Sequence, residues 1–321
     1  MSKPRISYSE FAAKQMKYAE GTVAHWIERY VRKQDGSKQP LGDSHRYVLR
    51  RLQRESFTQK PATELTKRDV IAYAEERIKN VAPATINQEL AYLSGVLKYV
   101  ESAWDEKVSD KPIRKAKPFL DREGMIGKSA PRTARPSAEQ IAMLLAYFEE
   151  QNKSDACKTD MALVTRWQIV SARRIGETCA LLWRDWIPED QVVLVRRMKD
   201  PRGPKAKVVA LPEKAQAMLM DMAYAMDTDP ELRTDEPRIF PFRTRTCVAR
   251  YVLAKKDLGI ENLHLHDNRR EAITRLIEDE KFAPEEVMLV SGHETTAILQ
   301  RTYMKQDPAR FKLGPKSMRA A

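Results

Sequence analysis

The sequence predicts a mainly α-helical protein of two domains, with one small antiparallel β-sheet in the second domain. Apolar residues recur at helical spacing through the first hundred residues. Two β-branched runs flank a turn-forming segment near residue 200. The intervening segment 106–135 is rich in charge, proline and glycine, and a chain of 321 residues is long enough for two domains that each bury a core.

Residues 1–105 are predicted to form the first, all-helical domain. Thr66 and Asp69 have the spacing of a capping box, which marks the start of one helix. Pro83 is placed to begin the next helix. The apolar residues of that helix recur at i, i+4, i+7, i+11 and i+14: Ile86, Leu90, Leu93, Leu97 and Val100.

An earlier helical stripe in this domain is accompanied by four arginines. They fit a solvated helix face and a DNA-binding surface equally well: Arg46, Arg50, Arg51 and Arg54.

Residues 106–135 break the helical pattern. The segment holds nine Lys or Arg residues against four acidic residues, and it is interrupted by Pro112, Pro118, Gly124 and Pro131. Such a composition is typical of a linker, so we expect a basic interdomain linker here.

Residues 136–303 are predicted to form the second domain. Pro136 and a capping box from Ser137 to Gln140 begin a helix that we expect to run through Phe148. The runs 191–198 and 206–211 are expected to pair as a β-hairpin, and the chain after Leu211 is expected to be mainly helical. Residues 304–321 are expected to be a C-terminal tail.

Composition indicates a polyanionic partner. The 57 Lys and Arg residues exceed the 45 Asp and Glu residues by 12, and such a basic balance most commonly serves nucleic acid. The three cysteines are widely spaced, which argues against a disulfide framework or a zinc knuckle. With neither a signal-peptide pattern nor a long apolar run, we expect a cytoplasmic protein without a membrane partner.

Arg174 and Glu177 are the first candidates for chemistry. They lie three residues apart in the segment 171–177, which Leu181, Trp183 and Asp185 follow. A phosphodiester is anionic, and the planar fork of an arginine can grip two of its oxygens. The neighbouring Arg173 is an alternative to Arg174, although the offset to Glu177 favours Arg174.

Further candidates follow along the chain. The hairpin carries Lys199, with Lys205 and Lys207 as competitors for the same role. The pairs His266 with Arg269 and Gly292 with His293 come next, and Tyr303 lies ten residues after His293. His264 and His266 are two residues apart, a spacing at which two histidines on a strand can bind one metal ion. However, no nearby acidic or cysteine cluster completes a metal site.

The order and spacing of these motifs resemble those of tyrosine site-specific recombinases, over residues 8–313. Within that family the details look similar to phage-type integrases and shufflon-type inversion enzymes. Ala172 departs from the pattern, because glycine is usual there, and so does Arg270, where histidine is common. The resemblance implies that residues 1–105 are a core-binding domain that clamps DNA and residues 136–303 the α+β catalytic domain.

The resemblance also implies the chemistry. Tyr303 would attack the scissile phosphate to form a 3′-phosphotyrosyl link, Lys199 would protonate the leaving 5′ oxygen, and Glu177 would support the site. Neither a cofactor nor a metal is implied. The side chains implied to stabilise the charged transition state are Arg174, His266, Arg269 and His293.

The implied partners are double-stranded DNA with specific recombination sites and three further copies of the chain, which form a homo-tetramer on DNA. Accessory DNA-bending proteins and docking of residues 304–321 on a neighbouring protomer are also expected. We expect Arg114, Lys115 and Lys117 to contact DNA phosphates. Two alternatives are a nicking and closing enzyme of the type IB topoisomerase kind, and a basic DNA-binding protein without catalysis.

Overall fold

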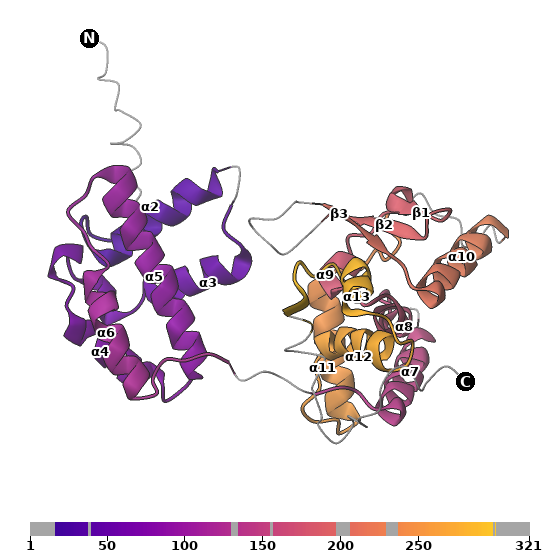
Figure 1. The fold of residues 1–321 in the computed structure, drawn as a ribbon. Coiled ribbons are helices and arrows are strands. Elements are labelled where there is room, and N and C mark those ends of the chain that lie inside the picture. The colour runs from indigo at the N-terminus through magenta and orange to yellow at the C-terminus, as the bar shows by residue number, and fades with distance from the viewer. Residues whose placement is uncertain are drawn as a thin grey trace, which may run out of the picture. The chain divides into compact units, whose positions relative to one another are not determined.

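The computed structural model describes residues 17–37, 40–129, 134–154, 157–196, 206–228, 237–297 and 299. The chain divides into two compact units between residues 130 and 131. Figure 1 shows that the first unit is built of helices and that the second combines helices with a small sheet. The predicted fold class is therefore confirmed. No helix in the described part of the chain is both long and apolar enough to span a membrane.

The first unit packs its helices around α5 and α6. Helices α2 and α3 contact α5, and α4 contacts α6. The predicted capping box is present, since the Thr66 side chain accepts a hydrogen bond from the Asp69 backbone N–H and Asp69 accepts one in return. The predicted apolar stripe of α5 is fully buried. The helices are α2 (Val23–Asp35), α3 (Asp43–Leu52), α4 (Lys67–Arg77), α5 (Pro83–Trp104) and α6 (Lys111–Arg122), with 3-10 turns η1 (Ser56–Gln59) and η2 (Ala62–Glu64).

The prediction of a linker over residues 106–135 is wrong, because residues 111–122 fold into α6 as part of the first unit. Ile113, Ala116 and Leu120 are fully buried, and their spacing of three and four residues places them on one helix face. Arg114 and Lys115 are exposed on the other side of the helix, and Lys117 is half-buried beside the stripe. Pro112 lies in the first turn, where its missing N–H removes no helical hydrogen bond. The first unit thus extends to residue 130 rather than 105.

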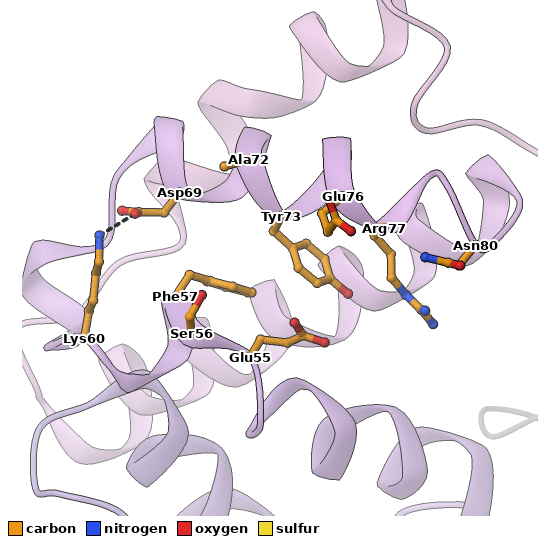
Figure 2. A pocket seen from close by; sticks show the side chains of 10 residues that line it. All are labelled: Glu55, Ser56, Phe57, Lys60, Asp69, Ala72, Tyr73, Glu76, Arg77 and Asn80. Carbon is orange, nitrogen blue, oxygen red and sulfur yellow. Dashed lines mark hydrogen bonds and ion pairs between the residues drawn. The ribbon is translucent and has the colours of Figure 1, made fainter.

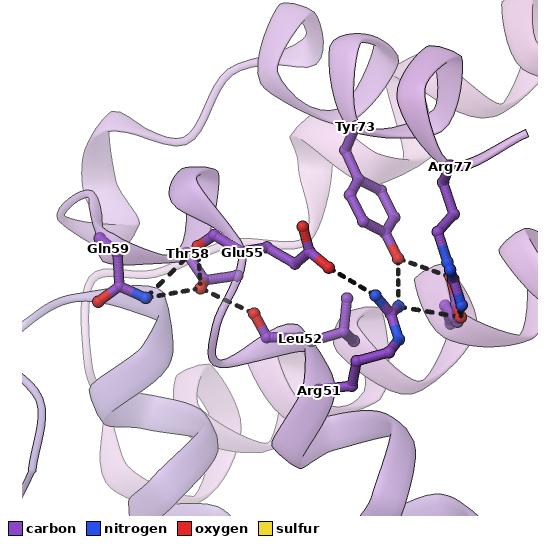
Figure 3. A network of polar contacts seen from close by, with 8 residues as sticks. Arg51, Leu52, Glu55, Thr58, Gln59, Tyr73 and Arg77 are labelled. Atoms are coloured by element: carbon purple, nitrogen blue, oxygen red, sulfur yellow. Dashed lines mark hydrogen bonds and ion pairs between the residues drawn. The ribbon is translucent and has the colours of Figure 1, made fainter. Parts of the chain in front are cut away.

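A buried carboxylate joins three helices of the first unit (Figure 3). Glu89 on α5 accepts a hydrogen bond of 2.6 Å from the Tyr73 hydroxyl on α4. Its Oε1 also lies 2.9 Å from Arg51 Nη2 on α3 and 3.0 Å from Arg77 Nη2. Burial, followed by the hydrogen bond to Glu89, raises the pKa of Tyr73. Arg51, which the sequence left open as a DNA contact, is therefore engaged in holding this unit together.

A cavity of roughly 400 Å³ lies beside this network (Figure 2). Phe57 and Tyr73 form an aromatic pair in its wall, with ring centroids 4.9 Å apart. Lys60 Nζ and Asp69 Oδ1 lie 2.6 Å apart at its edge. These two charges therefore pair within the unit.

The second unit surrounds helix α8, which contacts α7, α10 and α12. Its three-stranded antiparallel sheet has the order β1-β2-β3, with Val193 opposite Val209, which confirms the predicted hairpin. The predicted capping box at Ser137 is also present, and α7 continues past Phe148. The elements are α7 (Ala138–Asn152), α8 (Met161–Ser171), α9 (Ile175–Thr178), η3 (Trp183–Asp185), β1 (Trp186–Ile187), β2 (Val192–Val195), β3 (Lys207–Ala210), α10 (Glu213–Thr228), α11 (Thr244–Asp257), α12 (Leu265–Glu278) and α13 (Pro284–Ser291).

Shortening an α6 core residue tests whether this helix belongs to the first unit. Leu120→Ala should lower the local unfolding free energy by about 2–5 kcal/mol, because it removes buried methyl groups and leaves a cavity. Hydrogen exchange of the α4 and α5 amides measures this unit separately from the second. Lys115→Ala, on the exposed face of α6, is the control and should change the value by less than about 0.5 kcal/mol. Unchanged protection in Leu120→Ala would mean that α6 does not stabilise the unit.

Candidate active site

The turn between α8 and α9 positions two consecutive arginines in different environments. Helix α8 ends at Ser171, and Ala172 adopts a left-handed conformation with φ of 56°. This conformation explains why glycine suits the position, since an L-residue there costs roughly 1–2 kcal/mol. After the turn the Arg173 side chain is fully buried, whereas that of Arg174 is 26% exposed. The exposed fractions favour Arg174 over Arg173 as the residue that can meet a ligand from solvent.

Glu177 lies at the centre of the site, with 2% of its side chain exposed. Its Oε1 accepts a hydrogen bond of 2.5 Å from Arg174 Nη1, and its Oε2 accepts one of 3.2 Å from the Arg174 backbone N–H. Oε2 also lies 3.7 Å from Arg173 Nη1 and 3.8 Å from Arg269 Nη1. Burial raises the pKa of Glu177, but the charges of Arg173, Arg269 and Arg174 outweigh it and lower the pKa below its usual value.

Arg269 ties three segments of the second unit together. It lies on α12 and is fully buried. Its Nη1 donates to the Ala172 carbonyl at 2.5 Å, and its Nη2 donates to the Ser291 carbonyl at the end of α13 at 2.9 Å. The same guanidinium therefore satisfies backbone groups at two helix ends and stands against Glu177.

His293 follows the glycine that ends α13. Gly292 has φ of 72°, a left-handed conformation that glycine adopts without strain. The His293 Nδ1 lies 2.7 Å from Ser291 Oγ, and its Nε2 lies 3.4 Å from Arg269 Nη2. Burial, reinforced by the charges of Arg269, Arg174 and Arg173, lowers the pKa of His293 to about 3. The imidazole is therefore neutral at physiological pH.

His266 is the other histidine of the site and lies in the first turn of α12 with an exposed side chain. Enough protein surrounds the ring that burial, followed by the charges of Arg269 and Arg174, lowers its pKa. His266 and Arg174 are thus accessible to solvent, His266 as a neutral imidazole and Arg174 as a guanidinium. Arg269, whose charge acts on the His266 ring, is buried.

The structure brings together five of the residues expected from the sequence: Arg174, Glu177, His266, Arg269 and His293. Lys199, Lys205 and Tyr303 lie outside the described residues. Lys207 begins β3 opposite Val195 and is half-buried. The sequence reasoning missed Ser291, which orients His293, and it considered Arg173 only as a substitute for Arg174. The adjacency of Arg173 to Arg174 and of Ser291 to the Gly292-His293 pair was the available signal.

Arg135 was expected in the linker but is fixed on the helix that carries His266 and Arg269. Its Nε donates to Glu271 Oε2 at 2.9 Å, and its Nη1 donates to Glu278 Oε2 at 3.2 Å. The start of the second unit is thereby attached to α12.

Comparison with known proteins agrees with this geometry. The model of the phage integrase family matches residues 135–310. The chain is 26% identical over 289 residues to "Putative integrase/recombinase" of Haemophilus influenzae, which covers 88% of this chain and 86% of that protein. It is 25% identical over 246 residues to "Shufflon-specific DNA recombinase" of Escherichia coli, which covers 74% of this chain and 57% of that protein.

Among solved structures, a lambda integrase tetramer bound to a Holliday junction matches with a TM-score of 0.62 at 13% identity. The match covers 91% of this chain and 83% of that chain. At this level of identity the likeness concerns the fold.

The lowered pKa of His293 predicts a pH dependence of stability. The imidazole binds a proton near pH 6.5 in the unfolded chain but only near pH 3 in the folded protein, so the unfolded state holds more protons between these values. The unfolding free energy should therefore fall as the pH drops from 6.5 toward 4, by up to about 1.4 kcal/mol per pH unit from this residue. His293→Gln removes this contribution, and urea unfolding at pH 7 and 4.5 should show a smaller loss than in the wild type. Equal losses in the two proteins would contradict a neutral, buried His293.

Proposed function

We propose that this chain, which belongs to the phage integrase family, cuts and rejoins duplex DNA through a covalent link to Tyr303. The chain is a site-specific DNA recombinase of the tyrosine recombinase type, an enzyme of DNA breakage and rejoining. The observation that carries the residue assignment is the convergence of Arg174 and Arg269 on the ionised Glu177, with His266 and His293 beside these arginines. Such a cationic site suits a phosphodiester that gains charge as it is attacked.

The exposed fractions divide the work among these residues. Arg174 and the His266 ring, which solvent reaches, bind the non-bridging oxygens of the scissile phosphate. Arg269 fixes the turn at Ala172 and the end of α13, and it supplies a buried positive charge behind the phosphate. His293 is neutral, so its imidazole can accept a proton or a hydrogen bond during the reaction.

The Tyr303 oxygen attacks phosphorus and forms the 3′-phosphotyrosyl bond as the bond to the 5′ oxygen breaks. The phenol gives up its proton to the neutral imidazole of His293, and the departing oxygen takes one from Lys199, with Lys205 and Lys207 as alternatives. The new bond conserves the energy of the phosphodiester, so attack by a 5′ hydroxyl rejoins the strand. The proposal therefore assigns no cofactor.

The proposed partners are duplex DNA carrying specific sites and further copies of this chain, which form a homo-tetramer on DNA. The fold shared with the lambda integrase tetramer bound to a Holliday junction supports this assembly. Docking of residues 304–321 on a neighbouring protomer is part of the same proposal, and it lies outside the described residues. A ring of four such head-to-tail contacts closes on itself.

Helix α6 is the proposed non-specific DNA contact in the first unit. Arg114 and Lys115 are exposed on the side of the helix away from the buried stripe, and Lys117 is half-buried at the edge of that stripe. The Arg114 Nε also pairs with Asp110 Oδ1 at 2.9 Å, which holds the side chain at the start of the helix.

Changing Tyr303 to Phe should abolish covalent adduct formation while leaving DNA binding close to that of the wild type. Phenylalanine keeps the ring but lacks the attacking oxygen. A nicked substrate that traps the adduct, run on a denaturing gel, measures the reaction, and gel shift measures binding. An adduct that persists in Tyr303→Phe would place the nucleophile elsewhere.

On DNA that carries two recombination sites, the wild type should form Holliday junctions. Nicking and closing without junctions would indicate a topoisomerase-like enzyme.

Replacing Arg114, Lys115 and Lys117 together by Ala should reduce the slope of log affinity against log salt by about 2–3, since each phosphate contact releases roughly 0.9 counterions. The loss should be equal for cognate and random DNA, because phosphate contacts carry no sequence information. Binding titrations at several salt concentrations test this. A loss confined to cognate DNA would mean that α6 reads bases.

A further inference from the structure

Arg173 is a fully buried arginine beside the active site to which the mechanism above assigns no task. Its Nε donates to the Ser171 carbonyl at 3.3 Å, while its Nη1 and Nη2 have no hydrogen-bond acceptor in the described part of the chain. Burying a charge with so few hydrogen bonds costs several kcal/mol, so a surface or purely structural role explains it poorly. Burial, partly offset by Glu177, lowers the pKa of Arg173 to about 10, so the group remains charged at neutral pH.

The charge of Arg173 faces the Glu177 oxygen that Arg174 Nη1 does not hold. Arg174 Nη1 lies 2.5 Å from Oε1, whereas Arg173 Nη1 lies 3.7 Å from Oε2, the oxygen that Arg269 Nη1 also approaches at 3.8 Å. A phosphate that binds Arg174 competes with Glu177 for the same guanidinium, and two anions then stand close together. A further cation on Oε2 counteracts that repulsion.

We propose that Arg173 is a positioning residue for DNA strand cleavage: it neutralises Glu177 from behind, which lets Arg174 turn its guanidinium to the scissile phosphate. In this arrangement Glu177 keeps Arg174 oriented before DNA binds, and Arg173 holds the carboxylate once the phosphate has taken over Arg174. Arg173 does not touch the DNA, because its side chain is fully enclosed. The inference rests on the proposed role of Arg174.

The test uses the charge of the substrate. Arg173→Met replaces the guanidinium by an unbranched apolar side chain that a buried site can hold. Single-turnover adduct formation is measured on a site with an ordinary scissile phosphodiester and on one with a methylphosphonate there, which carries no negative charge. The variant should be roughly 10- to 100-fold slower on the phosphodiester but within about threefold of the wild type on the methylphosphonate. Arg166→Met, at an exposed arginine of α8, is the control and should leave both rates unchanged.

Equal slowing on both substrates would show that Arg173 serves only the fold, and no slowing on either would show that it has no role. Arg173→Lys on the phosphodiester adds a second measurement that does not depend on the methylphosphonate or on folding of the Met variant. It should retain within about tenfold of the wild-type rate, since it keeps a cation, and a loss as large as that of Arg173→Met would overturn the proposal. An adduct that survives Tyr303→Phe refutes the proposed nucleophile but not this inference, because the rate ratios are measured on whichever adduct forms.

Discussion

A carboxylate buried among guanidinium groups organises the catalytic unit. Glu177 is almost inaccessible, yet it stays ionised because Arg173, Arg174 and Arg269 approach it from the turn after α8 and from α12. None of these charges would be stable in a protein interior alone, since an isolated buried ion costs several kcal/mol. Together they form a centre whose positive charges outnumber its negative one, which is the requirement for binding a phosphodiester.

Arg269 connects this electrostatic centre to the backbone. Its guanidinium donates hydrogen bonds to the carbonyls of Ala172 and Ser291. These carbonyls lie at the C-terminal ends of α8 and α13, where backbone acceptors have no intrahelical donor. The left-handed conformation of Ala172 is tolerated because its carbonyl is satisfied and its methyl group is buried against α12 and α13. In the proposed mechanism the chemistry and the fold of this unit use the same side chain, so a change at Arg269 is expected to alter both.

The first unit applies the same principle away from any chemistry. Glu89 on α5 contacts Arg51 from α3 and both Tyr73 and Arg77 from α4, so one carboxylate joins three helices. A buried carboxylate with a full set of donors restricts helices to one arrangement. An arginine in a segment that resembles a DNA-binding face can thus serve the packing of the unit, as Arg51 does.

Local sequence rules determined much of this protein. The capping boxes at Thr66 and Ser137, the stripe of α5 and the β2-β3 hairpin depend on contacts within a few residues, so periodicity and turn chemistry predicted them. Arg174, Glu177, His266, Arg269 and His293 were identified because the order and spacing of their motifs resemble those of tyrosine recombinases.

Tertiary structure decided what each of those residues faces. The segment that forms α6 has the charge and prolines of a linker, which outweighed the helical spacing of Ile113, Ala116 and Leu120. Their burial in the first unit, where α6 packs against α4, decided that the segment is a core helix. The offset to Glu177 favoured Arg174 over Arg173 in the sequence, but only the turn at Ala172 shows that Arg173 is buried and Arg174 partly exposed. The exposure of a side chain and the charges around it depend on residues that are distant in the chain. A local sequence pattern therefore cannot predict them.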